Sequence, residues 1–321
     1  MKLLVVGGGI AGASVAYFAS QHGHTVTLLD AGGNRSSDVP AALLNPVRGQ
    51  SGKVEALALD GLRCTFALIR ELKGAGHAIP HAQSGVLRPV PDAKTQRKWA
   101  TNLPAELPHS WREPDGLPPG WHSTLHLPEG GWVSGAALVE ALKAASGARL
   151  VRGQAQHVSA TGAVLVGGET LSADAVVCCG GSFGASLSQP DGATHRAGSL
   201  LLLSDAPDQP RSYGAYLSPA ATGGVLGATF EAPAASHAEA LAQGLPLKSL
   251  DWLLGKGAAL ADLRVVSVTG RWTGVRLSPL RHGPDAAGVW HLSGLGSKGF
   301  LLGPLLARGL VGGIEAKARK G

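Results

Sequence analysis

Residues 2–30 read KLLVVGGGIAGASVAYFASQHGHTVTLLD, and this stretch decides the fold. The apolar run 2–6 is short and closed by glycine, which is typical of a buried parallel strand. Small residues over 13–22 predict a closely packed helix, and residues 25–29 predict a second strand. A strand, a glycine-rich turn, a helix and a strand in this order indicate a Rossmann-type nucleotide-binding unit.

The turn from Gly7 to Gly12 has the spacing G-x-G-x-x-G. Gly7 permits a tight turn, Gly9 lets the backbone approach a pyrophosphate, and Gly12 lets the helix pack on the strand. The helix N-terminus offers free N–H groups to phosphate. Asp30 ends the second strand and can accept hydrogen bonds from ribose hydroxyls. We therefore predict a dinucleotide site rather than a signal peptide or membrane anchor, which this many glycines would disrupt.

Composition narrows the class of protein. The chain has 321 residues, 44% of them hydrophobic, with 47 glycines and 20 prolines, which allows a sizeable core and many turns. Three cysteines, two of them adjacent, make neither a disulfide framework nor a zinc site, so we expect a cytoplasmic protein. The net charge of +6 suits RNA or an acidic substrate, although the basic residues are scattered. Histidine pairs at 77 and 81 and at 122 and 126 lie near prolines, so no metal site is expected.

The hydrophobic pattern changes after this first unit. Residues 53–73 have the apolar spacing of a helix, whereas the proline-rich residues 77–128 predict little beyond one strand at 85–90. Within 193–275, strands are predicted at 199–203, 213–217, 224–230 and 263–269. We therefore predict an α/β (α+β) fold in which a mainly antiparallel β substrate domain is inserted into a Rossmann-type domain.

A second glycine-rich turn, GGSFG at 180–184, follows a predicted buried strand at 174–179. It matches the G-x-S-x-G nucleophile elbow of α/β-hydrolases, and His195, His282 and His291 lie downstream. A hydrolase is therefore an alternative. Against it, the N-terminal turn favours a dinucleotide, and a turn of this kind also suits a cofactor-binding sheet.

A third glycine-rich turn, at 294–299, repeats the G-x-G-x-x-G spacing after a predicted strand at 289–293 and begins a helix that runs to the end. Only 22 residues follow Gly299, too few for another strand and terminal acid, so this is no second complete fingerprint. We predict that the turn folds back onto the first domain, so that both ends of the chain meet one cofactor.

Together these stretches resemble the D-amino-acid-oxidase family of FAD-dependent oxidoreductases over essentially the whole chain. The matching segments are the turn through Asp30, GGWV at 130–133, ADAVV at 173–177 with Gly180, YLSP at 216–219 and GVR at 274–276. Two further segments, 227–231 and 294–299 with 304–306, are similar to the oxidase domain of bifunctional tRNA wobble-uridine modification enzymes of the MnmC type. The resemblance implies FAD-binding segments 1–78, 129–192 and 276–321, and substrate-domain segments 79–128 and 193–275.

The resemblance also implies roles for individual residues. Arg276 would clamp a substrate carboxylate, Tyr216 would close on the substrate, and Lys298 would stabilise negative charge on the reduced flavin. The alternatives are a structural ion pair for Arg276, a packing role in the core for Tyr216, and a solvated charge at a helix end for Lys298. The residues implied for FAD binding are Gly7, Gly9, Ile10, Ala11, Gly12, Asp30, Ala31, Arg35, Ser37, Ala41, Ala42, Leu43, Leu44, Gly180, Gly181, Gly296, Ser297, Lys298, Gly299 and Phe300.

The expected activity is oxidation of a C–N bond of a small-molecule amine or amino acid, by hydride transfer to FAD with oxygen as acceptor. An MnmC-like oxidase with tRNA as its partner is the alternative within the fold, and a flavin-binding protein without oxidase activity is the alternative of another class. Three features depart from the family. Alanine stands at 41 and 42 where glycine is common, residues 277–284 lack T-x-D-x-x-P, and the chain is short.

Overall fold

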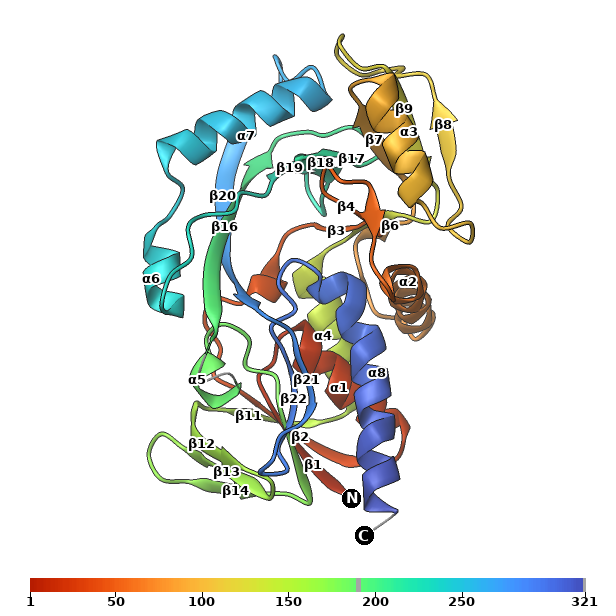
Figure 1. The fold of residues 1–321 in the computed structure, drawn as a ribbon. Helices are drawn as coiled ribbons and strands as arrows, with labels where there is room; N and C mark the ends of the chain where they lie inside the picture. Colours follow the sequence, from red (N-terminus) through yellow and green to blue (C-terminus); the bar gives the residue numbers. More distant parts are fainter. Residues whose placement is uncertain (189–191, 320–321) are drawn as a thin grey trace.

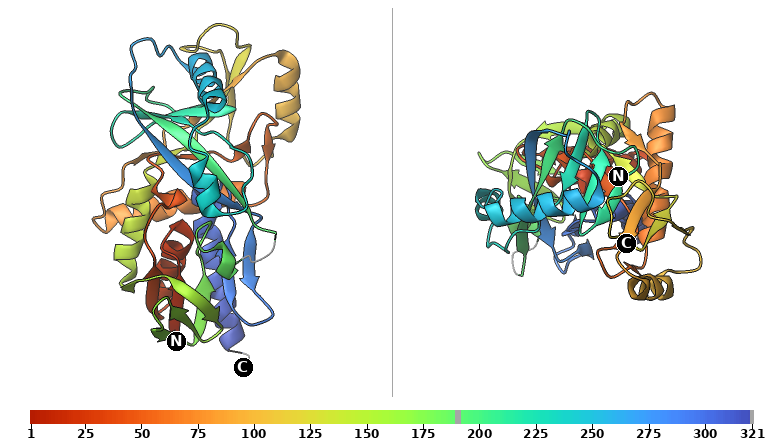
Figure 2. Two further views of the ribbon diagram at one scale, coloured as in Figure 1. Left: turned by 90° about the vertical axis from the view of Figure 1, so that its left-hand side faces the viewer. Right: turned by 90° about the horizontal axis from the view of Figure 1, so that it is seen from above.

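The computed structural model describes residues 1–188 and 192–319. Two large β-sheets form two lobes, and both termini lie at the same end of the molecule (Figures 1 and 2). Residues 189–191 and 320–321, which belong to the predicted segments 129–192 and 276–321, lie outside the described residues. The parallel sheet of one lobe and the mainly antiparallel sheet of the other confirm the predicted fold class.

The first lobe contains a six-stranded sheet in the order β11-β2-β1-β15-β22-β21. Its strands are β1 (Lys2–Val6), β2 (Thr25–Asp30), β11 (Arg149–Arg152), β15 (Ala175–Cys178), β21 (Arg281–Pro284) and β22 (Trp290–Ser293). All neighbours pair in parallel except β21 and β22. The three glycine-rich turns follow β1, β15 and β22, which are adjacent parallel strands. They therefore open at one edge of the sheet, where ligands bind in open α/β folds.

Strand β1 is buried on both faces. Leu3 and Val5 pack against α1 (Ile10–Gln21) and α8 (Gly299–Ala318), whereas Leu4 and Val6 face the three-stranded meander β12-β13-β14. The meander strands are β12 (Ala155–Ser159), β13 (Gly162–Leu165) and β14 (Thr170–Ser172). Burial on both faces explains why the run 2–6 is continuously apolar rather than alternating.

The second lobe is an eight-stranded sheet in the order β20-β16-β19-β18-β17-β7-β9-β8. Its strands are β7 (Val86–Val90), β8 (Ser110–Arg112), β9 (Ser123–Leu127), β16 (Thr194–Leu203), β17 (Arg211–Tyr213), β18 (Ala215–Pro219), β19 (Gly224–Gly227) and β20 (Val268–Ser278). Within the described residues of this sheet, only β7 and β17 pair in parallel. This pair joins two distant stretches of the chain into one sheet.

Several predicted elements are corrected by the structure. The helix predicted at 53–73 is α2 (Ala58–Gly74), because residues 53–54 form strand β5 and Leu57 has a left-handed φ of 66°. The strand predicted at 263–269 begins only at Val268, as β20. Helix α3 (Ala93–Asn102) was not predicted, because Trp99 is its only buried residue and an apolar stripe is missing.

The other helices and strands complete the two lobes and the region between them. They are η1 (Ser36–Asp38), β3 (Ala42–Leu44), β4 (Val47–Arg48), β5 (Lys53–Val54), β6 (His81–Ala82), β10 (Gly131–Val133), α4 (Gly135–Ser146), α5 (Ala185–Ser188), α6 (His237–Ala242) and α7 (Leu247–Leu260). Strands β3, β10 and β6 form a small sheet between the lobes.

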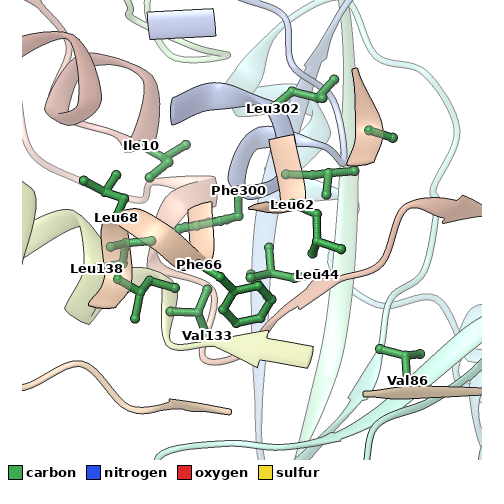
Figure 3. Close-up of a cluster of buried hydrophobic side chains, with 14 of the residues drawn as sticks. Ile10, Leu44, Leu62, Phe66, Leu68, Val86, Val133, Leu138, Phe300 and Leu302 are labelled. Atoms are coloured by element: carbon green, nitrogen blue, oxygen red, sulfur yellow. The ribbon is translucent and has the colours of Figure 1, made fainter. Parts of the chain in front are cut away.

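The largest hydrophobic cluster joins both ends of the chain (Figure 3). Ile10 from α1, Phe66 from α2, Leu138 from α4 and Phe300 from α8 meet in it. A buried hydrogen bond, from Thr65 Oγ1 to the Phe300 carbonyl at 2.8 Å, ties α2 to the beginning of α8. Each fully buried Leu or Phe contributes about 1.5–3 kcal/mol. The C-terminal helix is therefore anchored on the N-terminal unit.

Helix α8 is the one helix among the described residues that is long and apolar enough to cross a membrane. Half of its most apolar window is buried inside the protein, where α8 packs on α1 and α2. Core helices of this length have the same composition.

Candidate cofactor and substrate site

A cavity of about 520 Å³ opens between the two lobes. All three glycine-rich turns line it, together with Tyr216 and Arg276 from the eight-stranded sheet. A volume in this range is typical of cofactor and ligand sites. The predicted FAD residues Gly12, Ala41 and Leu44 do not line it; they lie just behind the wall, in the turn and in two hydrophobic clusters. The other predicted residues do line the cavity.

The first turn is packed so tightly that side chains have no room. A Cβ on Gly12 would stand 1.8 Å from the Gly7 carbonyl oxygen, and one on Gly7, where φ is +108°, 2.5 Å from the Cys179 carbonyl. The backbone N–H of Ile10, at the beginning of α1, donates to Ser37 Oγ at 3.0 Å. The helix N-terminus thus faces the cavity with a polar group beside it, an arrangement suited to a pyrophosphate.

Asp30 lies at the edge of the cavity with two cations. Its Oδ2 is 3.2 Å from Arg35 and 3.3 Å from Lys143, and its Oδ1 accepts the Gly32 N–H at 3.3 Å. Burial by itself raises the pKa of the Asp30 carboxyl, but Lys143, the Gly32 N–H and Arg35 together hold it below its usual value. Lys143 on α4, only 7% exposed, was missed from the sequence, where it looks like an ordinary helix-surface lysine.

The third turn meets the cavity through the N-terminus of α8. The Gly296 N–H donates to the Leu277 carbonyl at 2.9 Å, and Gly296 itself has a left-handed φ of 58°. Lys298 stands at the N-cap position and forms an ion pair with Glu55. Lys298 is therefore not the freely solvated charge considered as its alternative.

Tyr216 and Arg276 come from different strands, β18 and β20, and both face the cavity. The Tyr216 hydroxyl donates to the Ala41 carbonyl at 2.8 Å, which links the eight-stranded sheet to the segment before β3. Burial raises the pKa of the Tyr216 phenol, so it stays protonated at neutral pH. Because Tyr216 is only half-buried and lines the cavity, it is not simply a core tyrosine.

Arg276 has neutral partners. Its Nη1 donates to the Thr229 carbonyl at 3.0 Å, and its Cζ stands 4.2 Å from the centroid of the Phe230 ring. Within residues 1–188 and 192–319, no carboxylate lies within ion-pair distance of it, so the structural ion pair considered for it is not formed there. Burial lowers the pKa of Arg276 to about 10, which leaves it charged at neutral pH. A half-buried cation in a cavity wall with unused N–H groups is well placed to receive an anion.

Arg88, on β7, is a second arginine in the cavity wall, fully buried, and was not found from the sequence. It is 1% exposed, donates from Nη1 to the Val47 carbonyl at 3.0 Å and from Nη2 to the Gly49 carbonyl, and lies over the Trp99 ring. These bonds fix the β4–β5 hairpin against the eight-stranded sheet. A basic residue inside a proline-rich strand gives no signal of this role.

The hydrolase alternative requires a serine, a histidine and a carboxylate in contact, and the described residues provide only the first two. Ser182 Oγ lies 2.7 Å from His195 Nδ1 and 3.1 Å from His237 Nδ1. Neither histidine contacts a carboxylate in the described part of the chain, so the third member of a triad is missing there. Burial lowers the pKa of His195, and burial together with His195 lowers the pKa of His237. The trio connects the second glycine-rich turn to β16 and α6.

Comparison with known proteins identifies a family of FAD-dependent enzymes. A family model described as FAD dependent oxidoreductase (DAO) matches residues 2–312. Two curated relatives are named tRNA 5-methylaminomethyl-2-thiouridine biosynthesis bifunctional protein MnmC. The one from Maricaulis maris is 30% identical over 99% of this chain and 53% of its own length, and the one from Caulobacter sp. is 28% identical over 98% and 54%. The chain thus spans about half the length of the curated relatives it matches.

Solved structures of amine oxidases share the fold. Glycine oxidase from Bacillus cereus superposes with a TM-score of 0.83 at 21% identity, covering 98% of this chain and 95% of its own. Iminodiacetate oxidase from Chelativorans sp. superposes with a TM-score of 0.81 at 19% identity, covering 97% and 95%. At these identities the likeness concerns the fold.

Proposed function

Because the chain belongs to the D-amino-acid-oxidase family of FAD-dependent oxidoreductases, we propose that it oxidises a C–N bond of an amine or amino acid that carries a carboxylate. The observation that carries this proposal is Arg276. Its guanidinium lies in the cavity wall, hydrogen-bonded to one carbonyl and stacked on one ring, and its remaining N–H groups are available to a carboxylate. Tyr216 lines the same cavity.

The site residues suit an extended FAD. In this proposal, the first turn and Asp30 would hold the pyrophosphate and ribose, and Ala42 and Leu43, which line the cavity, would lie against the flavin. The N-terminus of α8 and Lys298, which line the same cavity, would stabilise the negative charge of the reduced flavin. FAD, when bound, would supply the acceptor for the hydride that leaves the carbon next to nitrogen. Water would hydrolyse the imine product, and oxygen would be the acceptor that reoxidises the flavin.

The test is an absorbance spectrum of the purified protein followed by anaerobic titration with glycine, sarcosine and D-amino acids. We expect flavin absorbance that is bleached by at least one carboxylate-bearing amine and restored by oxygen with formation of peroxide. Flavin that no amine bleaches would favour a flavin-binding protein without oxidase activity. Protein that neither contains FAD nor takes it up would contradict the proposal altogether.

A second candidate is an MnmC-like oxidase acting on a modified tRNA base. Two observations favour it. The relatives named MnmC match almost the whole chain, and the cavity carries aromatic surface that a small amino acid does not need. Of the five phenylalanines, Phe183 and Phe230 are 51% and 58% exposed and both line the cavity. Exposed aromatic rings are typical platforms for an unstacked base.

The two candidates differ in the substrate that reduces the flavin. For the second, we expect bleaching by tRNA that carries a carboxymethylaminomethyl base and none by the same tRNA without the modification, together with a salt-dependent gel shift. Bleaching by free glycine or sarcosine at an equal rate would favour the small-molecule activity. The cytoplasmic location expected from the sequence is compatible with either candidate and is part of the proposal.

A further inference from the structure

The position of Arg276 depends on a missing side chain in the neighbouring strand. In the antiparallel pair β16–β20, Arg276 lies opposite Arg196, and Gly274 opposite Gly198. A Cβ on Gly198 would stand 2.0 Å from Arg276 Nη1. The guanidinium therefore lies directly above Gly198 and crosses β16 diagonally, which is possible only because the strand has no side chain there.

On the far side of β16 the guanidinium meets the segment 229–231. This segment is held to β16 by two hydrogen bonds, from Thr229 N to the Ser199 carbonyl at 2.9 Å and from Glu231 N to the Ala197 carbonyl at 3.1 Å. The segment in turn supplies the Thr229 carbonyl at 3.0 Å from Arg276 Nη1 and the Phe230 ring at 4.2 Å from its Cζ. One N–H and one face of the guanidinium are thus fixed.

Arg276 and Arg196 together place a net positive charge on this face of the sheet. Arg196, directly opposite Arg276, donates from Nη1 to the Glu231 carbonyl at 2.9 Å, so two like charges share one face of the sheet. Such a pair is unfavourable by itself. The Glu231 carboxylate accepts from Ser249 Oγ at 2.8 Å; it is outside ion-pair distance of both arginines, although its charge raises the pKa of Arg276 and offsets part of the positive charge. An incoming carboxylate would offset this charge.

We propose that Phe230 and Gly198 are positioning residues that fix the plane of the Arg276 guanidinium and thereby select substrates with a carboxylate. This rests on the proposed function of Arg276 as the carboxylate clamp. Phe230 covers one face of the guanidinium by a cation–π contact, and the missing side chain at Gly198 leaves the space that the Arg276 side chain occupies. The remaining N–H groups are then presented to the cavity as a rigid fork. Preorganisation of this kind lowers the entropy lost on binding.

The experiment measures acetate binding to the oxidised, FAD-loaded protein from the change in the flavin spectrum, with acetamide as the uncharged matched ligand. For Phe230→Leu we expect acetate binding weakened about 3- to 10-fold, and for Gly198→Ala about tenfold or more, with little change for acetamide. Phe230→Tyr keeps the aromatic face and should restore acetate binding. Trp252→Leu, an exposed aromatic on α7 outside the cavity, is the matched control and should not change it.

Turnover gives an independent readout. With any amine that bleaches the flavin, KM should rise in Phe230→Leu while kcat and the flavin-to-protein absorbance ratio stay near wild type. Unchanged acetate affinity in Phe230→Leu, no acetate binding by the wild type, or parallel loss of FAD and acetate binding would overturn the positioning role. If no amine bleaches the wild type while acetate binding follows the expected order, the proposed oxidase function fails and the positioning role stands.

Discussion

The two G-x-G-x-x-G turns, at 7–12 and 294–299, have the same spacing but different physical reasons for it. In the first turn, Cβ atoms on Gly7 and Gly12 would overlap backbone atoms at 2.5 and 1.8 Å. In the third turn, a Cβ on Gly296 would come no closer than 4.0 Å to the Leu277 carbonyl oxygen, and the glycine is needed for its left-handed φ of 58°. Close packing therefore requires glycine at Gly7 and Gly12 of the first turn, where Gly7 also has a φ of +108°, whereas at Gly296 the requirement is the backbone conformation.

The surroundings of the two turns also differ. The first is followed by helix α1, strand β2 and Asp30, the complete series that a dinucleotide site requires. Within the described residues the third leads into α8, whose first turn is held by Thr65 and whose N-cap lysine is paired with Glu55. The first turn is a complete binding unit, and the third adds one helix terminus to the same cavity.

The largest expected effect is that of Gly12→Ala, which tests the close packing of the first turn. The new Cβ would force α1 away from β1, and overpacking of this kind costs about 3 kcal/mol. We expect a clearly lower Tm of the apoprotein and loss of nearly all bound FAD, measured by thermal melting and by the flavin-to-protein absorbance ratio. A variant that retains FAD and melts within about 2 °C of wild type would show that the turn tolerates a side chain.

The second largest effect is expected for Arg276→Ala. This substitution tests whether substrate binding by the eight-stranded sheet is independent of FAD binding by the glycine-rich turns. Hydrogen bonds to a charged group contribute about 1.5–3 kcal/mol, so acetate affinity and substrate KM should worsen about 10- to 100-fold while FAD content is kept. Arg276→Lys should restore only part of the loss, since a lysine has no planar fork. Equal loss of FAD and of acetate binding would instead mean that Arg276 is structural.

The sequence predicted best those elements whose signals lie within one short stretch of the chain. Residues 2–30 carry their own strand, turn and helix signals, and the three glycine-rich turns lie as expected on one cavity. Contacts between distant segments gave no such signal. Lys143 reaches Asp30 from α4, Arg88 reaches the β4–β5 hairpin from β7, and Glu55 pairs with Lys298 over more than two hundred residues. Helix α3 was missed because Trp99 alone anchors it.

Gly296→Ala is expected to have a smaller effect than either substitution above and tests the conformational role of the third turn. Forcing alanine into a left-handed φ costs about 1–2 kcal/mol. Gly147→Ala is the matched control, because Gly147 ends α4 with a φ of 60° and a methyl group added there would meet no other described segment within 4 Å. Both should lower the Tm of the apoprotein equally, and only Gly296→Ala should also weaken FAD binding. Unequal melting losses would show close packing at Gly296 as well.

The smallest expected effect concerns Asp30, the acid that only the first turn possesses. Lys143, the Gly32 N–H and Arg35 outweigh burial and hold the pKa of Asp30 below its ordinary value of 3.8. A carboxyl whose pKa is lower in the folded than in the unfolded chain stabilises the fold above its ordinary pKa and loses this contribution as the pH falls through the folded value. Because Asp30 is partly exposed to solvent, the contribution is expected to be under about 1 kcal/mol.

Melting the apoprotein over a pH series measures this contribution. The difference in Tm between wild type and Asp30→Asn should be constant from about pH 8 to about pH 5 and shrink below about pH 4. Lys143→Met removes the strongest of the opposing charges and should move the loss to higher pH. If Asp30→Asn follows the wild type at every pH, its ion pairs contribute nothing to folding. The acid of the first turn would then serve the bound nucleotide alone, and the contrast with the third turn would be one of ligand binding rather than of stability.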